Sequence, residues 1–272
     1  MEYEIKPKEK LNLGINELWH YRELFYFFTW RDIKVKYKQT FLGFAWAVLQ
    51  PLFMMVIFSL FFGRALKVPS DDLPYPIFVF SGLILWNIFA TGISAAGNSM
   101  VTNANIIKKI YFPRLIIPIS SVLVSLFDFM MSVLIFIGML IYYQIPIHIL
   151  NLLLFPLLGI IVTCISTFGL GTLLAALNIK YRDFRYVIPF MIQALMFITP
   201  VIYPVSILTN EYLKYIFALN PMYAAVVLFR SGFINVPLQL NLLLISLISG
   251  ILFLFVGLFY FRKTEAYFAD LA

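Results

Sequence analysis

The chain has 272 residues, of which 62% are hydrophobic and only 12% are charged, and its formal net charge is +7. A soluble domain carries about a quarter charged residues, so this composition excludes an ordinary soluble protein and indicates a membrane protein. The positive charge is typical of cytoplasmic loops in membrane proteins and requires no nucleic-acid partner. The single cysteine, Cys164, lies in an apolar stretch, so no disulfide framework is expected.

The first element in chain order is an amphipathic segment over residues 15–37. Apolar and charged side chains alternate along it, among them Leu18, Trp19, Arg22, Glu23, Phe25, Phe28, Arg31 and Lys34. Aromatic residues on one side and cations on the other are typical of a helix that lies in the membrane interface. A soluble amphipathic helix is the alternative interpretation.

Six long apolar stretches then predict six membrane-spanning helices, because a helix needs about 20 apolar residues to cross a bilayer. The predicted spans cover residues 41–62, 76–97, 115–143, 149–177, 186–203 and 238–261. Residues 206–236, between the last two spans, are too polar to cross fully. We expect short re-entrant or interfacial helices there, buried in protein.

The distribution of basic residues predicts which side of the membrane each loop faces. Sixteen of the twenty Lys and Arg residues lie in segments 1–40, 108–114, 180–185 and 262–272, which six crossings would place on one side. The positive-inside rule predicts that this side, with both termini, faces the cytoplasm. We therefore expect one membrane domain over residues 1–272, with a cytoplasmic and interfacial segment to residue 40, a six-span core over 41–261 and a short tail.

Asp128 is an ionisable residue within a predicted span, where a charge is costly and often functional. Ser121, Ser125 and Ser132 are the predicted neighbours that could bond its carboxylate. A functional role, a structural hydrogen bond and a position nearer the interface are all left open by the sequence.

Motifs of catalysis are absent from the sequence. It contains no GxxxxGK[ST] phosphate-binding loop and no G-x-S-x-G nucleophile motif. His20 and His148 are predicted on opposite sides of the membrane, so no metal site is expected. We expect the chain to be no enzyme and to bind no cofactor itself.

Four stretches together resemble the permease subunit of ATP-binding-cassette exporters of cell-surface polysaccharide, and most closely the O-antigen exporter permease. The stretches are RDIKVKYKQTFLGFAWAVLQPL (31–52), NANIIKKIYFPRLIIP (103–118), NIKYRDFRYVIPFMIQALMFITPVIYP (178–204) and NPMYAAVVLFR (220–230). They follow one another over nearly the whole chain, which makes the resemblance specific.

The resemblance implies a homodimer that works with two copies of a cytoplasmic ATPase subunit, which would bind ATP and magnesium. It implies a coupling helix over residues 98–111 and a second contact in the loop after residue 179. The residues implied in coupling are Asn98, Asn103, Asn105, Lys108, Lys109, Tyr111, Lys180, Arg182, Asp183 and Arg185. The positive-inside rule alone would also place basic residues in these loops.

A polysaccharide would need a channel, because each unpaired hydroxyl group is costly in hydrocarbon. Aromatic side chains could offer stacking faces, and helical spacing groups some of them: Phe78, Trp86 and Phe89 in the second span, and Phe190 and Phe197 in the fifth. We expect these residues to line the channel. Pro200, Tyr203 and Pro204 are expected to break the fifth span and contribute to an outer gate.

The function that the resemblance implies is export of lipid-linked O-antigen-type polysaccharide across the cytoplasmic (inner) membrane of a bacterium. Loading would occur from the inner leaflet near Trp19, Arg22, Glu23, Arg31 and Lys34. Alternatives are a teichoic acid or capsule exporter permease, and a drug or haem exporter of the same superfamily. An ion-coupled secondary transporter would need intramembrane charged pairs or an internal repeat, and a membrane glycosyltransferase would need acidic clusters.

Overall fold

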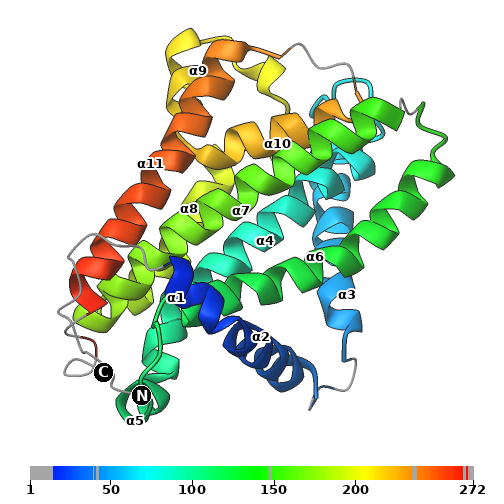
Figure 1. Ribbon diagram of the computed structural model, residues 1–272. Coiled ribbons are helices and arrows are strands. Elements are labelled where there is room, and N and C mark those ends of the chain that lie inside the picture. The colour runs from blue at the N-terminus through cyan, green and yellow to red at the C-terminus, as the bar shows by residue number, and fades with distance from the viewer. Residues whose placement is uncertain are drawn as a thin grey trace.

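The computed structural model describes residues 15–38, 40, 43–146, 149–234, 238–265 and 268. All regular elements in these ranges are helices, and the long ones lie side by side as a tilted bundle (Figure 1). This arrangement satisfies the backbone hydrogen bonds within each helix, as a membrane-spanning chain requires.

Five helical stretches are long and apolar enough to cross a membrane. They are Ala45–Ala65, α4 (Tyr75–Thr102), α6 (Ile116–Tyr142), α7 (Ile149–Lys180) and α11 (Leu240–Glu265). The first of them consists of α3 (Ala45–Phe58), which continues as a π-helix over Ser59–Ala65. These helices confirm five of the six predicted spans.

The fifth predicted span, 186–203, is shorter than expected. Its helix, α8 (Phe184–Ile198), has 15 residues, which corresponds to about 22 Å and is less than the bilayer core of about 30 Å. Thr199 has extended backbone geometry, because the residue before a proline disfavours the helical conformation. The chain then turns through buried residues to a short 3₁₀ helix at Val205–Ile207.

Two short helices with a 97° bend between them separate α8 from α11, as predicted, but the first of them is mostly exposed and not buried as expected. They are α9 (Glu211–Ala218) and α10 (Pro221–Ser231). Asn210 and Asn220 cap them by accepting hydrogen bonds from the backbone N–H groups of Tyr212 and Met222. Every residue of α10 is buried, so its polar groups are kept away from lipid.

The core is built around α4, which packs against α3, α6, α7, α8 and α10. Close approach at a second contact, between α7 and α11, depends on Gly169 and Gly257, since a Cβ atom at either position would collide with the opposite helix. Small residues are the usual means of tight helix packing in membranes. The bundle is therefore held by close backbone contacts as well as by large side chains.

The amphipathic segment is helical, as predicted, but it forms two helices, α1 (Ile15–His20) and α2 (Arg22–Tyr37). The buried side of α2 consists of Phe28, Ile33 and Tyr37, and this helix packs on α6. Trp19 and Trp30 are exposed. The helix therefore presents large aromatic groups on its outer side, as expected for an interfacial helix.

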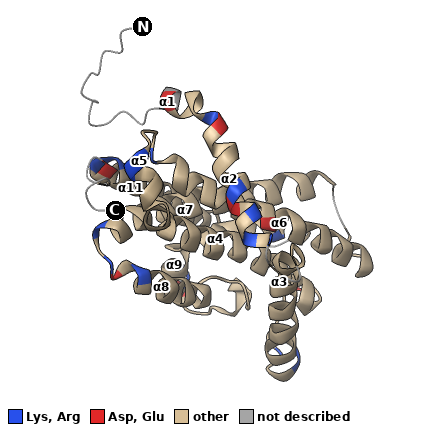
Figure 2. Cartoon of the chain, turned by 90° about the horizontal axis from the view of Figure 1, so that it is seen from below, with Lys and Arg blue, Asp and Glu red and all other residues tan. Residues whose placement is uncertain are grey.

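Basic segments that are far apart in sequence gather at one end of the bundle. A buried cluster joins α2, the short helix α5 (Ala104–Lys109), the start of α6 and the ends of α7 and α11. Seen from this end, Lys and Arg positions lie at α5, near the start of α8, at the end of α11 and along α2 (Figure 2). The predicted grouping of these segments is thus present among the described residues.

Candidate functional site

A groove of about 1000 Å³ runs along one side of the bundle between α2, α3, α4, α6 and α8. Its floor is a polar stripe on α4, made of Asn87, Thr91, Ser94, Asn98 and Thr102. These residues follow one another at intervals of three or four, which places them on one face of the helix. A membrane helix that is otherwise apolar thus presents a continuous row of hydrogen-bonding groups to the groove.

Amide side chains from two other helices face the same groove, Gln50 from α3 and Gln193 from α8. The side chains of Gln50, Asn87 and Gln193 make no hydrogen bond to any other residue that the structure describes. Each amide carries both donors and an acceptor. The groove therefore offers unpaired donors and acceptors to a polar solute.

Aromatic rings lie beside these amides. Trp46 and Phe53 of α3 and Trp86 of α4 line the groove, and Trp46 and Phe53 are 48% and 58% exposed. Such rings provide apolar faces with a specific geometry. Amides and flat apolar faces in one groove suit a ligand that has both hydroxyl groups and C–H surfaces.

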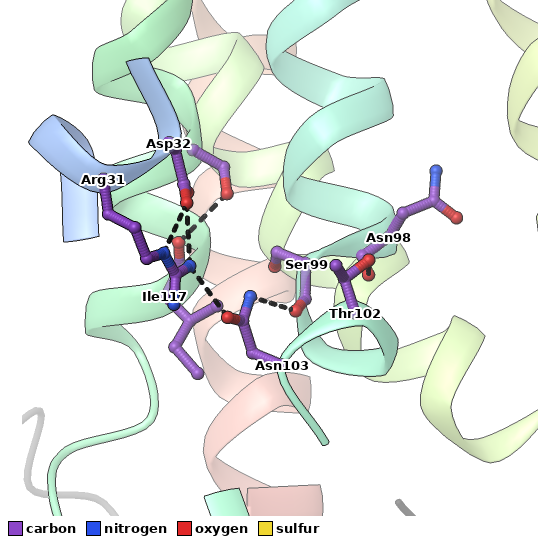
Figure 3. A network of polar contacts seen from close by, with 8 residues as sticks. Arg31, Asp32, Asn98, Ser99, Thr102, Asn103 and Ile117 are labelled. Carbon is purple, nitrogen blue, oxygen red and sulfur yellow. Dashed lines mark hydrogen bonds and ion pairs between the residues drawn. The ribbon is translucent and has the colours of Figure 1, made fainter. Parts of the chain in front are cut away.

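Cations lie at one end of the groove, where α2 meets the end of α4 (Figure 3). The guanidinium of Arg31 bonds the Asp32 carboxylate at 2.9 and 2.7 Å and also donates to Asn103 Oδ1 at 2.8 Å. The amide of Asn103 in turn donates to the Ser99 carbonyl at 2.8 Å. This network fastens α2 to the junction between α4 and α5.

Asp128 is bound by α2 and not by the serines that the sequence indicated. Its carboxylate accepts hydrogen bonds from Lys36 and Tyr37, and its side chain is 14% exposed. Burial and the neighbouring carboxylate raise the pKa of Tyr37 above its ordinary value. The predicted serine partners are wrong because the Ser121, Ser125 and Ser132 hydroxyls bond backbone carbonyl groups.

The predicted coupling helix over residues 98–111 is shorter in the structure, since only Ala104–Lys109 form α5. Asn98 belongs to α4 and accepts a hydrogen bond from Asn178 at 3.1 Å, while Asn103 is 7% exposed and bonds Arg31. These two asparagines therefore join helices inside the chain. The coupling helix is shorter than predicted because α4 extends beyond its predicted apolar span and ends only at Thr102.

The remaining predicted coupling residues are exposed at one end of the bundle: Asn105, Lys108, Lys109, Tyr111, Lys180, Arg182, Asp183 and Arg185. The side chain of Asn178 donates to the Gly97 carbonyl at 2.9 Å, so the ends of α4 and α7 lie side by side. The two loops that follow these ends consequently share one surface, which we call the coupling surface.

The predicted channel aromatics separate into three groups. Trp86 borders the groove but is only 4% exposed. Phe78 and Phe89 are completely buried in the core around α4, so in this structure they present no face to a channel. Phe190 and Phe197 are 72% and 66% exposed on α8, outside the lining of the groove. Helical spacing grouped these residues on one face of α4, but it did not predict which neighbouring helices pack against that face.

The predicted outer gate residues lie in the turn after α8, where Pro200 and Pro204 are buried. The Tyr203 hydroxyl donates to the Phe197 carbonyl. Arg230 of α10, within the segment where re-entrant or interfacial helices were predicted, is buried beside this turn and donates to the carbonyl oxygens of Pro200 and Val201 at 2.7 and 2.9 Å. It fastens α10 to the turn.

The groove amides are the functional candidates that sequence reasoning missed. A signal was present, because polar residues recur every three or four positions along the second predicted span, from Asn87 to Thr102. Gln50 and Gln193 are likewise amides within predicted apolar spans. Aromatic spacing alone gives no indication of this polar row.

These features define a class, a multi-pass membrane protein with a polar groove between its helices. Residues 23–234 match the ABC-2 type transporter family, and the chain therefore belongs to that family. The resemblance stated from the sequence is confirmed at this level.

Named relatives extend over most of the chain. It is 29% identical over 264 residues to the O-antigen export system permease protein RfbA of Klebsiella pneumoniae, covering 97% of this chain and 98% of that protein. It is 30% identical over 223 residues to the protein of the same name from Myxococcus xanthus, covering 80% and 83%. The polysialic acid transport protein KpsM of Escherichia coli is 26% identical over 248 residues, covering 86% and 91%.

Proposed function

We propose that this chain is the membrane-spanning subunit of an ATP-driven exporter in the bacterial cytoplasmic membrane. Its substrate is a lipid-linked O-antigen-type polysaccharide, which moves from the cytoplasm to the outer face of that membrane. The proposal is carried by the unpaired amides of Gln50, Asn87 and Gln193 in the groove of a chain whose full-length relatives include O-antigen export permeases. A capsule polysaccharide is the second candidate, favoured by the likeness to a polysialic acid transport protein.

The chemistry of the groove supports a glycan. Unpaired hydroxyl groups are costly in an apolar medium, and Asn87, Gln50 and Gln193 supply partners for them. The exposed rings of Trp46 and Phe53 supply apolar faces for the C–H surfaces of sugar rings. The stripe on α4 carries no fixed charge between Asn87 and Thr102 that would retain the polymer.

A second copy of the chain closes the groove into a channel. The helices α3 and α8, which border the groove, carry large exposed apolar side chains that include Phe53, Phe190 and Phe197. Two-fold symmetry is the commonest arrangement of homo-oligomers. A two-fold axis brings α3 and α8 of one protomer against the same helices of the other, and the two grooves together enclose one path between the protomers.

The energy of ATP hydrolysis reaches this chain through the coupling surface. A separate ATPase subunit binds ATP and magnesium and contacts α5 and the loop after α7 on each protomer. Movement of α5 passes directly to α4 through Asn103, and the hydrogen bond from Arg31 to Asn103 carries it to α2. The groove and the interfacial helix at which the lipid-linked end is loaded then move together.

The test is co-expression with the cognate ATPase, followed by co-purification and measurement of surface glycan. Charge reversal in Lys108→Glu/Lys109→Glu is expected to abolish ATPase co-purification and export, because both lysines are exposed on α5. Lys263→Glu is the matched control, since it is an exposed lysine at the same end of the bundle on α11. Robust ATP hydrolysis by the chain alone, or export driven by a proton gradient, would contradict the proposal.

A further inference from the structure

A separate cavity of about 290 Å³ lies at the end of the bundle opposite the coupling surface. Its lining comes from the loop that precedes α4, whereas α5 and the coupling surface follow the far end of the same helix. The segment after α8, the helices α9 and α10, and the residues before α11 complete its walls. We call this cavity the outer pocket.

Tyr223 gives the first indication of a ligand. It lines the outer pocket and is only 3% exposed, yet its hydroxyl has no hydrogen-bond partner among the residues that the structure describes. The hydroxyl oxygen is not among the fully buried unpaired atoms of the described residues, so it is open to the cavity that Tyr223 lines. A hydroxyl in this position can donate to and accept from a ligand that enters the cavity.

The other polar groups of the outer pocket define the chemistry of that partner. Asp71 accepts a hydrogen bond from Ser206 at 2.8 Å, and Lys214 is paired with Glu211 at 2.6 Å. The Asp72 carboxylate and the Gln239 amide have no hydrogen-bond partner in the described part of the chain. A carboxylate, an amide and a phenol together can bond several hydroxyl groups at once.

The size and the lining of the outer pocket further restrict the class of ligand that it can bind. Small-molecule sites usually have volumes of about 300–1,000 Å³, so 290 Å³ is room for a single sugar ring and not for an oligosaccharide. Val205, Val227 and Ile234 add apolar surface to the lining. A metal ion fits less well, because no group of three or more metal-ligating side chains occurs in the described residues.

We propose that the outer pocket binds one sugar residue of the glycan on the outer side of the membrane. This inference rests on the proposed function, because it supplies a second contact for the same polymer beyond the groove. Tyr223, Asp72 and Gln239 bond the hydroxyl groups of the sugar, and the aliphatic side chains cover its C–H face. Pro204 also lines the pocket, so occupation acts directly on the turn that we assign to the outer gate.

Binding is tested with the purified full chain in lipid nanodiscs. The probes are the methyl α-glycosides of glucose, mannose and galactose and free N-acetylglucosamine, observed by saturation-transfer difference NMR. At least one probe should receive saturation from the protein. Tyr223→Phe and Asp72→Asn should each weaken its binding about tenfold, as expected for the loss of one good hydrogen bond.

Two features make these variants informative. The Tyr223 hydroxyl has no described partner to lose, so Tyr223→Phe should leave the melting temperature unchanged. Asp72 has a φ angle of +64°, which asparagine tolerates as well as aspartate. Tyr212→Phe is the control, because Tyr212 is 82% exposed on α9 and does not line the pocket. It should bind the probe normally.

The outcomes separate the two proposals. No saturation of any probe, normal binding by Tyr223→Phe, or binding of calcium alone that Asp72→Asn removes would each overturn the sugar site. Co-purification with the ATPase is measured on the same preparations, since it depends on the opposite end of the bundle. A complex that forms without sugar binding rejects the outer pocket alone, whereas failure of the complex rejects the proposed function.

Discussion

At the scale of single residues, the charges of Asp128 and Arg230 lie within the described part of the bundle and are stabilised in different ways. The Asp128 carboxylate forms an ion pair with the Lys36 ammonium group. Arg230 instead donates to four neutral oxygen atoms, those of the Phe78, Pro200 and Val201 carbonyls and the Ser81 hydroxyl. Its guanidinium also lies 3.6 Å from the centre of the Phe78 ring. Buried charges of this kind stabilise a fold only while all their partners are present.

Arg230→Met should therefore destabilise the chain. Methionine fills similar space but leaves the carbonyl groups of the turn after α8 without donors, and we expect a loss of about 3 kcal/mol. The measurement is the melting temperature of the purified protein in detergent. Arg185→Met, at an exposed position in the first turn of α8, should melt like the unchanged chain. Equal melting of both variants would show that the buried guanidinium contributes no stability.

A second prediction concerns Asp128. Asp128→Asn removes the charge that holds Lys36 and weakens the bond from Tyr37, so α2 should separate from α6 more often. Hydrogen exchange of the backbone amides in residues 22–37 should become several-fold faster, because local opening governs exchange. Asp183→Asn lies in an exposed loop and should not alter it. Unchanged exchange in Asp128→Asn would exclude a clamp on α2.

At the scale of elements, α4 combines structural and functional roles on opposite faces. Its fully buried side chains, among them Phe78 and Phe89, hold the core, while the row from Asn87 to Thr102 faces the groove. The helix also leads into α5 after a single residue, Asn103. A displacement of α5 therefore moves the floor of the groove without an intervening flexible loop.

Replacing the polar row should block export without preventing assembly. Asn87→Leu/Thr91→Val removes an amide and a hydroxyl from the floor of the groove, and we expect surface glycan to fall at least about tenfold, the equivalent of one lost hydrogen bond. ATPase co-purification should persist. Asn241→Leu, an exposed change on α11 away from the groove, is the control. Normal export by the double variant would assign the path to another surface.

At the scale of the whole molecule, the groove opens on one side of the chain, and exposed aromatic residues lie on the helices that border it. Lipid could cover these residues, as could a second copy of the chain. Only the second copy would enclose a polar path, because hydrocarbon cannot pair with Asn87 or Gln193. The oligomeric state is therefore linked to the proposed transport.

Cross-linking in the native membrane tests this arrangement. In a Cys164→Ala background, Phe53→Cys and Phe190→Cys should give dimers with a short bismaleimide, since both side chains are exposed on the borders of the groove. Leu153→Cys on α7 and Leu252→Cys on α11 are also exposed and should remain monomeric. Dimers formed only through the latter pair would place the interface on the opposite side.

The sequence by itself determined the class of protein, the long helices and the presence of short helices between α8 and α11. Hydropathy and charge are local properties, and a helix satisfies its own backbone wherever about 20 apolar residues follow one another. The grouping of the basic loops follows from the number of crossings, and the exposed Lys108 and Arg182 occupy the predicted surface.

Only the tertiary structure decided which faces of these helices meet. Tyr37 bonds Asp128, 91 residues further along the chain, and Arg31 bonds Asn103 across 72 residues. Phe78 and Trp86 shared a predicted face and both are buried, yet Phe78 packs against Arg230 whereas Trp86 lies at the edge of the groove. In a chain that is hydrophobic nearly all round, periodicity does not distinguish core from groove, because lipid and protein interiors select the same apolar side chains.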